Sequence, residues 1–240
     1  RARSSNNDWL PPGADSRGGG IGAKCHTVRF AAVRKGSLLI LRRILAVAVC
    51  LIAATGIAFG AGLTLTADGK TPYTIVGDPD ATAAEEHAAA ELAAFLEQVT
   101  GVQFPIRHTV VMRSGPMILV GPGRVAQRVL PTLDIDGLKP DGIVIQTCGK
   151  HLVLAGDHPR GTLYAVYTFL EDVVGCRWWS SKVSTIPRRA TLTIPEQQVR
   201  YVPPLEYRET FWLDAFDGDW AARNKSNGSR PVLDEKRGGK

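Results

Sequence analysis

Five carboxylic acids and a tryptophan crowd into residues 206–219, the densest group in this chain that could do sugar chemistry. The acids are Glu206, Glu209, Asp214, Asp217 and Asp219, and Trp212 lies among them. Hydrolysis of a glycosidic bond uses two carboxyl groups, about 5–5.5 Å apart in retaining enzymes and about 6.5–9.5 Å apart in inverting ones. A working pair normally draws on elements further apart than one expected strand and one loop. We therefore expect no catalytic pair in this chain.

A role in sugar contact is a separate prediction for part of this group. Aromatic faces stack on sugar rings, and carboxylates accept hydrogen bonds from hydroxyl groups. On this basis Trp212, Asp214 and Asp219 are candidate substrate-binding residues. The structural alternative is that Asp217 or Asp219 caps a short helix at Trp220.

Other site chemistries have weaker support. The run from Gly121 to Ala126 matches the dinucleotide pattern G-x-G-x-x-A, with Asp141 twenty residues after Gly121. Asp141, however, opens an expected strand, whereas the pattern needs an acid where a strand closes. The histidines lack metal-ligand spacing, and no nucleophile elbow is present. We expect no cofactor and no metal.

The clearest structural elements lie between residues 142 and 179. Two runs rich in β-branched residues and leucine, 142–147 and 152–155, flank a break of hairpin length at Cys148-Gly149-Lys150. The apolar spacing then changes to that of a helix face over residues 163–174. Asp157 is the expected N-cap, Pro159 suits the first turn, and Gly175 is the expected stop. This region predicts strand, turn, strand and helix, with the helix folded back on the hairpin.

The remaining elements are predicted to extend this layer. The strongest is a helix over residues 82–99, which begins with a capping box at Thr82 and Glu85 and ends before Gly101. A short helix is expected at 124–130 and another at 220–224. Strands are expected at 63–66, 73–76, 105–111, 117–120, 190–194, 198–202 and 206–212. The predicted fold class is α+β, a mixed sheet with two long amphipathic helices packed on it.

Charge argues against a nucleic-acid partner. The net charge is +6, but residues 1–43 carry nine Lys or Arg and two acids, which leaves the remainder with twenty bases and twenty-one acids. The folded part therefore has no basic surface for phosphates.

The N-terminal quarter of the chain predicts export. Residues 1–35 are rich in Gly, Arg, Ser and Asn and are expected to be a disordered tail or mistranslated leader. Residues 36–61 have the form of a signal peptide or N-terminal anchor, with Arg42-Arg43 before an apolar run and small residues near Gly60. A retained leader would be the only membrane attachment. The expected location is periplasmic, extracellular or on the cell surface.

Two cysteines, Cys148 and Cys176, lie after this leader. A disulfide between them could persist in an oxidising compartment. The alternative is that Cys176 is a small buried hydrophobic residue.

One stretch carries a family resemblance. Gly142-Ile-Val-Ile, Leu152-Val-Leu-Ala-Gly156, Arg160-Gly-Thr-Leu-Tyr164 and Gly175-Cys-Arg-Trp-Trp179 occur in order. Together they resemble the N-terminal domain of family 67 α-glucuronidases, which is related to the domain before the barrel of family 20 β-hexosaminidases. The resemblance covers residue 63 to the end and is strongest over 142–179.

The resemblance implies a domain order and a context. It implies an α+β domain at 62–203, followed at 204–240 by the beginning of an incomplete (β/α) barrel, in a secreted bacterial glycosidase-like protein that acts on polysaccharides or glycoconjugates. In such enzymes the acid/base carboxylates come from the barrel, so this piece would be a non-catalytic accessory domain. The alternative is a stand-alone carbohydrate-binding or cell-surface module.

Overall fold

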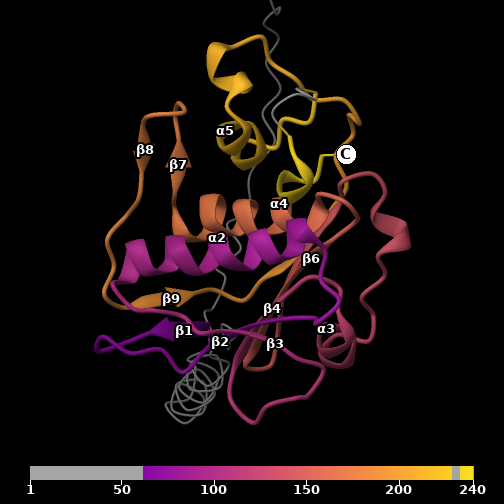
Figure 1. Ribbon diagram of the computed structural model, residues 1–240. Coiled ribbons are helices and arrows are strands. Elements are labelled where there is room, and N and C mark those ends of the chain that lie inside the picture. Colours follow the sequence, from indigo (N-terminus) through magenta and orange to yellow (C-terminus); the bar gives the residue numbers. More distant parts are fainter. Residues whose placement is uncertain (1–61, 229–232, 240) are drawn as a thin grey trace, which may run out of the picture. The chain divides into compact units, whose positions relative to one another are not determined.

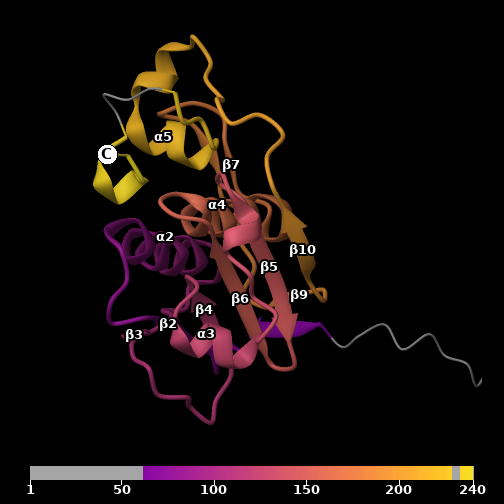
Figure 2. The same ribbon diagram turned by 90° about the vertical axis from the view of Figure 1, so that its right-hand side faces the viewer.

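The computed structural model describes residues 62–228 and 233–239. Their centre is a six-stranded sheet with the order β10-β5-β6-β4-β2-β3. The strands are β2 (Thr74–Gly77), β3 (Ile106–His108), β4 (Met117–Val120), β5 (Ile143–Cys148), β6 (His151–Gly156) and β10 (Gln198–Tyr201). Strands β3, β2, β4 and β6 run parallel, while β5 and β10 are antiparallel to their neighbours. Figure 2 shows β6, β5 and β10 side by side.

Helices cover both faces of the sheet. Alternate strand residues point to opposite sides, so Ile75 and Ile118 belong to one core while Val76 and Leu119 belong to another. The first core is closed by α2 (Ala83–Thr100) and α4 (Gly161–Thr168), which lie side by side in Figure 1. The second is closed by α3 (Arg124–Val129) and the short turn η1 (Asp136–Leu138). The α+β fold class with a mixed sheet is confirmed.

The predicted capping box on α2 is present. The Thr82 hydroxyl accepts from the Glu85 N–H, and the Glu85 carboxylate accepts from the Thr82 N–H at 2.8 Å. Gly101 ends the helix in the left-handed conformation, where a side chain would be strained. Local sequence chemistry therefore decides both ends of this helix.

The α4 region begins later than its sequence predicts. Its N-cap is Arg160, and the Asp157 side chain does not cap it; the Asp157 carbonyl instead accepts from the Gly161 N–H at 2.6 Å. The helix continues as the wider π-helical turn η2 (Phe169–Val174), which ends at Gly175 as predicted. The later start follows from close packing of backbones, because a Cβ on Gly156 would lie 2.3 Å from the Gly161 carbonyl carbon.

Two small sheets and a C-terminal segment complete the described part. The pair β1 (Leu63–Thr66) and β9 (Leu192–Ile194) forms one sheet, and the hairpin β7 (Arg177–Trp178) and β8 (Ser184–Thr185) forms another, which the sequence did not predict. Then follow η3 (Leu213–Phe216), α5 (Gly218–Arg223) and η4 (Glu235–Arg237). Within the described ranges, no helix is both long and apolar enough to cross a membrane. The predicted leader at 36–61 lies outside those ranges.

The strand predicted at 206–212 is wrong. This stretch is irregular, because its backbone bonds to a loop and not to a neighbouring strand: the Arg208 N–H donates to the Asn227 side chain, and the Asn227 N–H donates to the Arg208 carbonyl, each at 2.8 Å. Ala221, Ala222 and Leu233 are buried in the same core as α2 and α4. Residues 205–228 and 233–239 thus pack on the helical layer, with no strand over 206–212.

Candidate functional site

The carboxyl ends of the parallel strands β2, β4 and β6 form the first place to look for a site. In open α/β sheets, ligands bind beyond these ends, where successive helices leave toward opposite faces. Here α2 follows β2 onto one face and α3 follows β4 onto the other. The loops after the three strands start at Asp78, Gly121 and Asp157. We call these loops the carboxyl edge.

The carboxyl edge is filled by its own side chains. Asp78 accepts from the Arg124 backbone N–H at 2.9 Å and from the Arg124 guanidinium at 2.9 Å, and Arg124 also reaches Asp80 at 2.6 Å. These hydrogen bonds from Arg124 hold the pKa of Asp78 well below its usual range. The crevice between the β2 and β4 loops retains about 10 Å³. That volume is at the lower limit for one water molecule, so no sugar or nucleotide fits there.

The G-x-G-x-x-A run therefore does not form a pyrophosphate site. A pyrophosphate would bond to the free N–H groups at the start of the following helix. In α3 the Arg124 N–H already serves Asp78, and a Cβ added at Gly121 would lie 3.1 Å from the Glu85 carboxylate. The two carboxylates would repel a phosphate.

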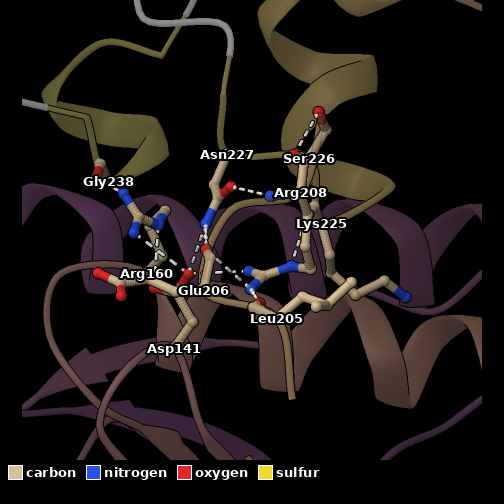
Figure 3. A network of polar contacts seen from close by, with 9 residues as sticks. All are labelled: Asp141, Arg160, Leu205, Glu206, Arg208, Lys225, Ser226, Asn227 and Gly238. Atoms are coloured by element: carbon tan, nitrogen blue, oxygen red, sulfur yellow. Dashed lines mark hydrogen bonds and ion pairs between the residues drawn. The ribbon is translucent and has the colours of Figure 1, made fainter. Parts of the chain in front are cut away.

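A buried carboxylate joins the core to the C-terminal segment. Asp141, only 1 % exposed, accepts from Arg160 at 2.9 and 3.1 Å, from Arg208 at 2.8 Å and from the Asn227 amide at 3.0 Å. Figure 3 shows these side chains converging on it from three separate segments. Arg160 also donates to the Gly238 carbonyl. We call Asp141, Arg160, Arg208 and Asn227 the clasp.

A small cavity of about 120 Å³ lies beside the clasp, lined partly by Asp141, Tyr164, Arg208 and Lys225. The Tyr164 hydroxyl is buried and makes no hydrogen bond to the described residues. Burial, together with the nearby Asp141 carboxylate, raises the pKa of Tyr164 to about 12, so the phenol is neutral at physiological pH. The Arg208 guanidinium lies 5.7 Å from the centre of the Tyr164 ring. Through this contact, Arg208 packs the C-terminal segment against Tyr164 of α4.

The tip of the β7–β8 hairpin and residues 205–216 carry apolar side chains that are exposed instead of buried. Large apolar side chains are exposed there, with Phe211 at 97 %, Leu213 at 86 %, Trp212 at 67 % and Trp179 at 64 %. Other exposed members are Val183, Leu205, Tyr207 and Phe216. We call the exposed side chains of residues 179–183 and 205–216 the ledge. Several large apolar side chains exposed close together in the sequence make this segment a candidate place of interaction.

The ledge is tied together by one polar contact. Asp214 accepts from the Ser181 N–H at 2.8 Å and from the Ser181 hydroxyl at 2.7 Å, which joins η3 to the tip of the β7–β8 hairpin. These two bonds lower the pKa of Asp214. Phe211 and Phe216 meet edge to face, with ring centres 6.4 Å apart.

The three predicted sugar-contact residues have different surroundings. Trp212 and Asp214 lie in one turn of the ledge. Asp219 is on α5 and pairs with Arg237 at 2.7 Å. Asp217 caps α5 by accepting from the Trp220 N–H at 2.8 Å, as the structural alternative predicted.

The two adjacent tryptophans have different surroundings, with Trp178 buried and Trp179 exposed. Trp178 packs edge to face against Phe95 and Tyr167, with ring centres 5.3 and 5.6 Å away, but its buried indole N–H has no partner among the described residues. Trp179 faces solvent and donates to the Thr185 hydroxyl at 2.9 Å.

The cysteine pair is not bonded. Both thiols are free: Cys148 donates to the Val129 carbonyl at 3.0 Å, and Cys176 is fully buried. Burial raises the pKa of Cys176 to about 11, so this thiol behaves as the small hydrophobic residue that the sequence offered as the alternative.

Sequence reasoning missed the clasp and the Ser181 contact. Asp141 was read only as the start of a strand, although an acid before a glycine, in a left-handed backbone conformation with φ of 58°, is typical of a turn. No cluster of three or more metal-ligating side chains occurs in the described ranges.

Comparison with known proteins adds a family to this geometry. Residues 65–169 match the family model of the glycosyl hydrolase family 67 N-terminus. Over these residues the chain is similar to a family 67 N-terminal domain. The family segment spans β2 to α4, and so includes the carboxyl edge, Asp141 and Arg160 but not the ledge. No curated protein matches the chain.

Several solved structures resemble this chain in part. A family 115 4-O-methyl-α-glucuronidase with specificity for decorated arabinogalactans shares 18 % identity over 61 % of this chain and 19 % of its own, with a TM-score of 0.44. A Streptomyces plicatus β-hexosaminidase shares 15 % over 70 % and 30 %, with a TM-score of 0.44. A Flavobacterium johnsoniae chitobiase shares 17 % over 69 % and 24 %, with a TM-score of 0.40. The chain spans less than a third of each.

Proposed function

We propose that residues 62–239 form a non-catalytic accessory domain of an exported, glycoside hydrolase-like protein of polysaccharide or glycoconjugate metabolism. In this proposal a following barrel domain supplies the catalytic carboxylates. The family 67 N-terminal match supports the carbohydrate context. The accessory role is supported chiefly by the carboxyl edge, where Asp78 and Arg124 occupy the space in which such sheets hold ligands.

The placement of the other acids supports the same role. Asp141 is committed to two arginines, Asp217 to a helix cap and Asp219 to Arg237. A general acid or nucleophile must face a sugar, and it must lie within a few ångströms of a second carboxyl group. These three carboxylates instead face their own chain.

The test compares the 240-residue chain with a longer product of the same reading frame. Both are assayed on chromogenic α-glucuronides and N-acetyl-β-glucosaminides. We expect no turnover by the shorter chain and turnover by the longer one. We also expect Glu206→Gln to leave kcat of the longer product unchanged. Turnover by the 240-residue chain alone would overturn the proposal.

Export is a separate part of the proposal and has its own test. The charged and apolar form of residues 36–61 supports it. Expression in a bacterial host, followed by fractionation and N-terminal sequencing, should find the protein outside the cytoplasm with a new N-terminus near Gly60. Arg42→Glu together with Arg43→Glu should retain it inside.

The alternative function is a stand-alone carbohydrate-binding or cell-surface module. The exposed rings of Trp179 and Trp212 favour it. It predicts glycan affinity without any catalytic partner.

A further inference from the structure

We propose that the ledge binds neutral or amino-bearing glycans, with Trp212 and Trp179 stacking on sugar rings and Asp214 accepting hydrogen bonds from sugar hydroxyls. This inference rests on the proposed carbohydrate context and names the ligand class of an accessory surface. It concerns residues outside the family 67 segment, which ends at residue 169.

The indole rings of Trp179 and Trp212 are exposed to solvent, and a hydrogen bond holds the Trp179 ring in place. Trp212 and Trp179 keep about two thirds of their surface in solvent. The indole N–H of Trp179 donates to the Thr185 hydroxyl on the neighbouring strand, which fixes the ring on the hairpin. A ring that is already fixed loses little conformational entropy when a sugar stacks on it. The hairpin therefore presents a preformed apolar face.

Asp214 supplies a fixed acceptor beside these rings. Its Oδ1 takes both hydrogen bonds from Ser181, so the carboxylate is anchored to the hairpin tip. Because these bonds lower its pKa, Asp214 is ionised at neutral pH, and an ionised carboxylate is an acceptor only. Sugar hydroxyl groups are donors that match it. Asp219 stays outside the site, since Arg237 neutralises it.

The charge of the surface decides which sugars fit. The ledge contains three acids, Glu206, Glu209 and Asp214, and two bases, Lys182, whose charge acts on Asp214, and Arg208, which is turned inward to Asp141. A uronic acid would meet like charge, whereas a neutral sugar would not and an amino sugar would be attracted. The same repulsion argues against a second copy of this chain, since two acidic surfaces would face each other. A protein with an apolar, basic surface is the competing occupant.

Isothermal titration of the 240-residue chain provides the test. The probes are hexasaccharides of xylose, N-acetylglucosamine and glucosamine, with an oligogalacturonate as the anionic comparison. We expect the neutral and amino-bearing probes to bind at least about tenfold more tightly than the uronate. Trp212→Ala should weaken binding by at least about tenfold. Tyr201→Ala removes an exposed aromatic side chain on β10, outside the ledge, and should leave the glycan affinity unchanged.

Two further variants separate glycan binding from protein docking. Asp214→Asn should reduce the discrimination against the uronate, because it removes the charge and keeps the shape. Leu213→Ala removes an exposed aliphatic side chain that cannot stack on a sugar, so glycan affinity should hold. Circular dichroism confirms that each variant is folded, and Trp179→Ala replaces Trp212→Ala if the latter is not.

Several outcomes would overturn the inference. They are the absence of oligosaccharide binding at millimolar concentrations, equal affinity in Trp212→Ala, preference for the uronate, or self-association by sedimentation that Leu213→Ala abolishes in a chain that binds no glycan. None of these outcomes bears on turnover by the shorter and longer products, so the inference and the proposed function fail separately.

Discussion

The carboxyl edge and the ledge treat their side chains in opposite ways. At the edge, Asp78 and Arg124 satisfy each other and leave about 10 Å³ between the loops. On the ledge, Phe211 and Leu213 lie almost wholly in solvent. Burying an apolar side chain contributes about 1.5–3 kcal/mol, a gain that these ledge side chains do not make within the described part of the chain. The difference separates a place where the chain fills its own crevice from a place where apolar side chains stay open to solvent.

The clasp helps to hold the ledge in place. Residues 205–228 have no strand pairing, so they are held by side chains: Arg208 and Asn227 at Asp141, Asp214 at Ser181, and Ala221 and Ala222 in the core. A buried carboxylate with three polar partners holds a segment only while all partners are present. The ledge should therefore respond to changes in the clasp, while the carboxyl edge should not.

The largest predicted effect comes from Asp141→Asn. Asparagine tolerates the left-handed backbone at this position, so the change removes charge without straining the chain. It leaves Arg160 and Arg208 without their buried partner, and breaking such a pair costs roughly 3–5 kcal/mol. Denaturant unfolding measures the loss, and hydrogen exchange should show protection lost over 205–228 but kept in β2 and β4.

The matched control is Asp136→Asn, which removes an exposed partner of Lys139. Exposed ion pairs contribute about 0–1 kcal/mol, so this variant should unfold like the parent. Equal stability of Asp141→Asn and Asp136→Asn would show that the clasp does not hold the segment.

A second prediction concerns the carboxyl edge. Gly121→Ala places a side chain at φ of 90° and 3.1 Å from the Glu85 carboxylate. Gly149→Ala, in the β5–β6 turn, also has positive φ, of 56°, but meets nothing within 4 Å. A strained backbone conformation costs about 1–3 kcal/mol, so both variants should be destabilised. The added contact should make Gly121→Ala the worse of the two in thermal unfolding; the reverse order would mean that the edge is not tightly packed.

The sequence predicted the elements whose cause is local. The capping box at Thr82 and Glu85, the stop at Gly101 and the Asp217 cap depend on residues a few positions apart. Apolar patterning likewise located β4 and the paired runs β5 and β6. For these, the responsible chemistry lies within one short window of the chain.

The sequence could not predict what depends on distant partners. Arg160, Arg208 and Asn227 reach Asp141 across 19, 67 and 86 positions. The apolar periodicity of the sequence does not predict contacts between residues so far apart. The stretch at 206–212 has the alternation of a strand, but without a neighbouring strand it bonds to Asn227 instead. The candidate residue Asp214 was predicted from its type, whereas its anchor, Ser181, followed only from the fold.

A third prediction concerns how the stability that Asp78 gives to the carboxyl edge depends on pH. Hydrogen bonds from Arg124 lower the folded-state pKa of Asp78, so the contribution of this carboxylate is complete above its unfolded pKa of about 3.9. It is lost as pH falls through the lower, folded value. The parent should therefore be more stable than Asp78→Asn at pH 6, and the gap should narrow below about pH 4. Because Arg124 is half exposed, the gap should also shrink in high salt. A gap that widens toward acid would contradict the ion pair.

The smallest effect is expected on the ledge itself. Phe211→Ser removes a ring that is 97 % exposed, and surface substitutions of this kind change the free energy of unfolding by about 0.5 kcal/mol or less. Val111→Ser, on an exposed loop away from the ledge, is the matched control and should behave alike in denaturant titration. A loss of more than about 1 kcal/mol in Phe211→Ser alone would place this ring in the packing of the domain. The contrast between a filled edge and an open ledge would then fail, because the ledge would be serving stability and not a partner.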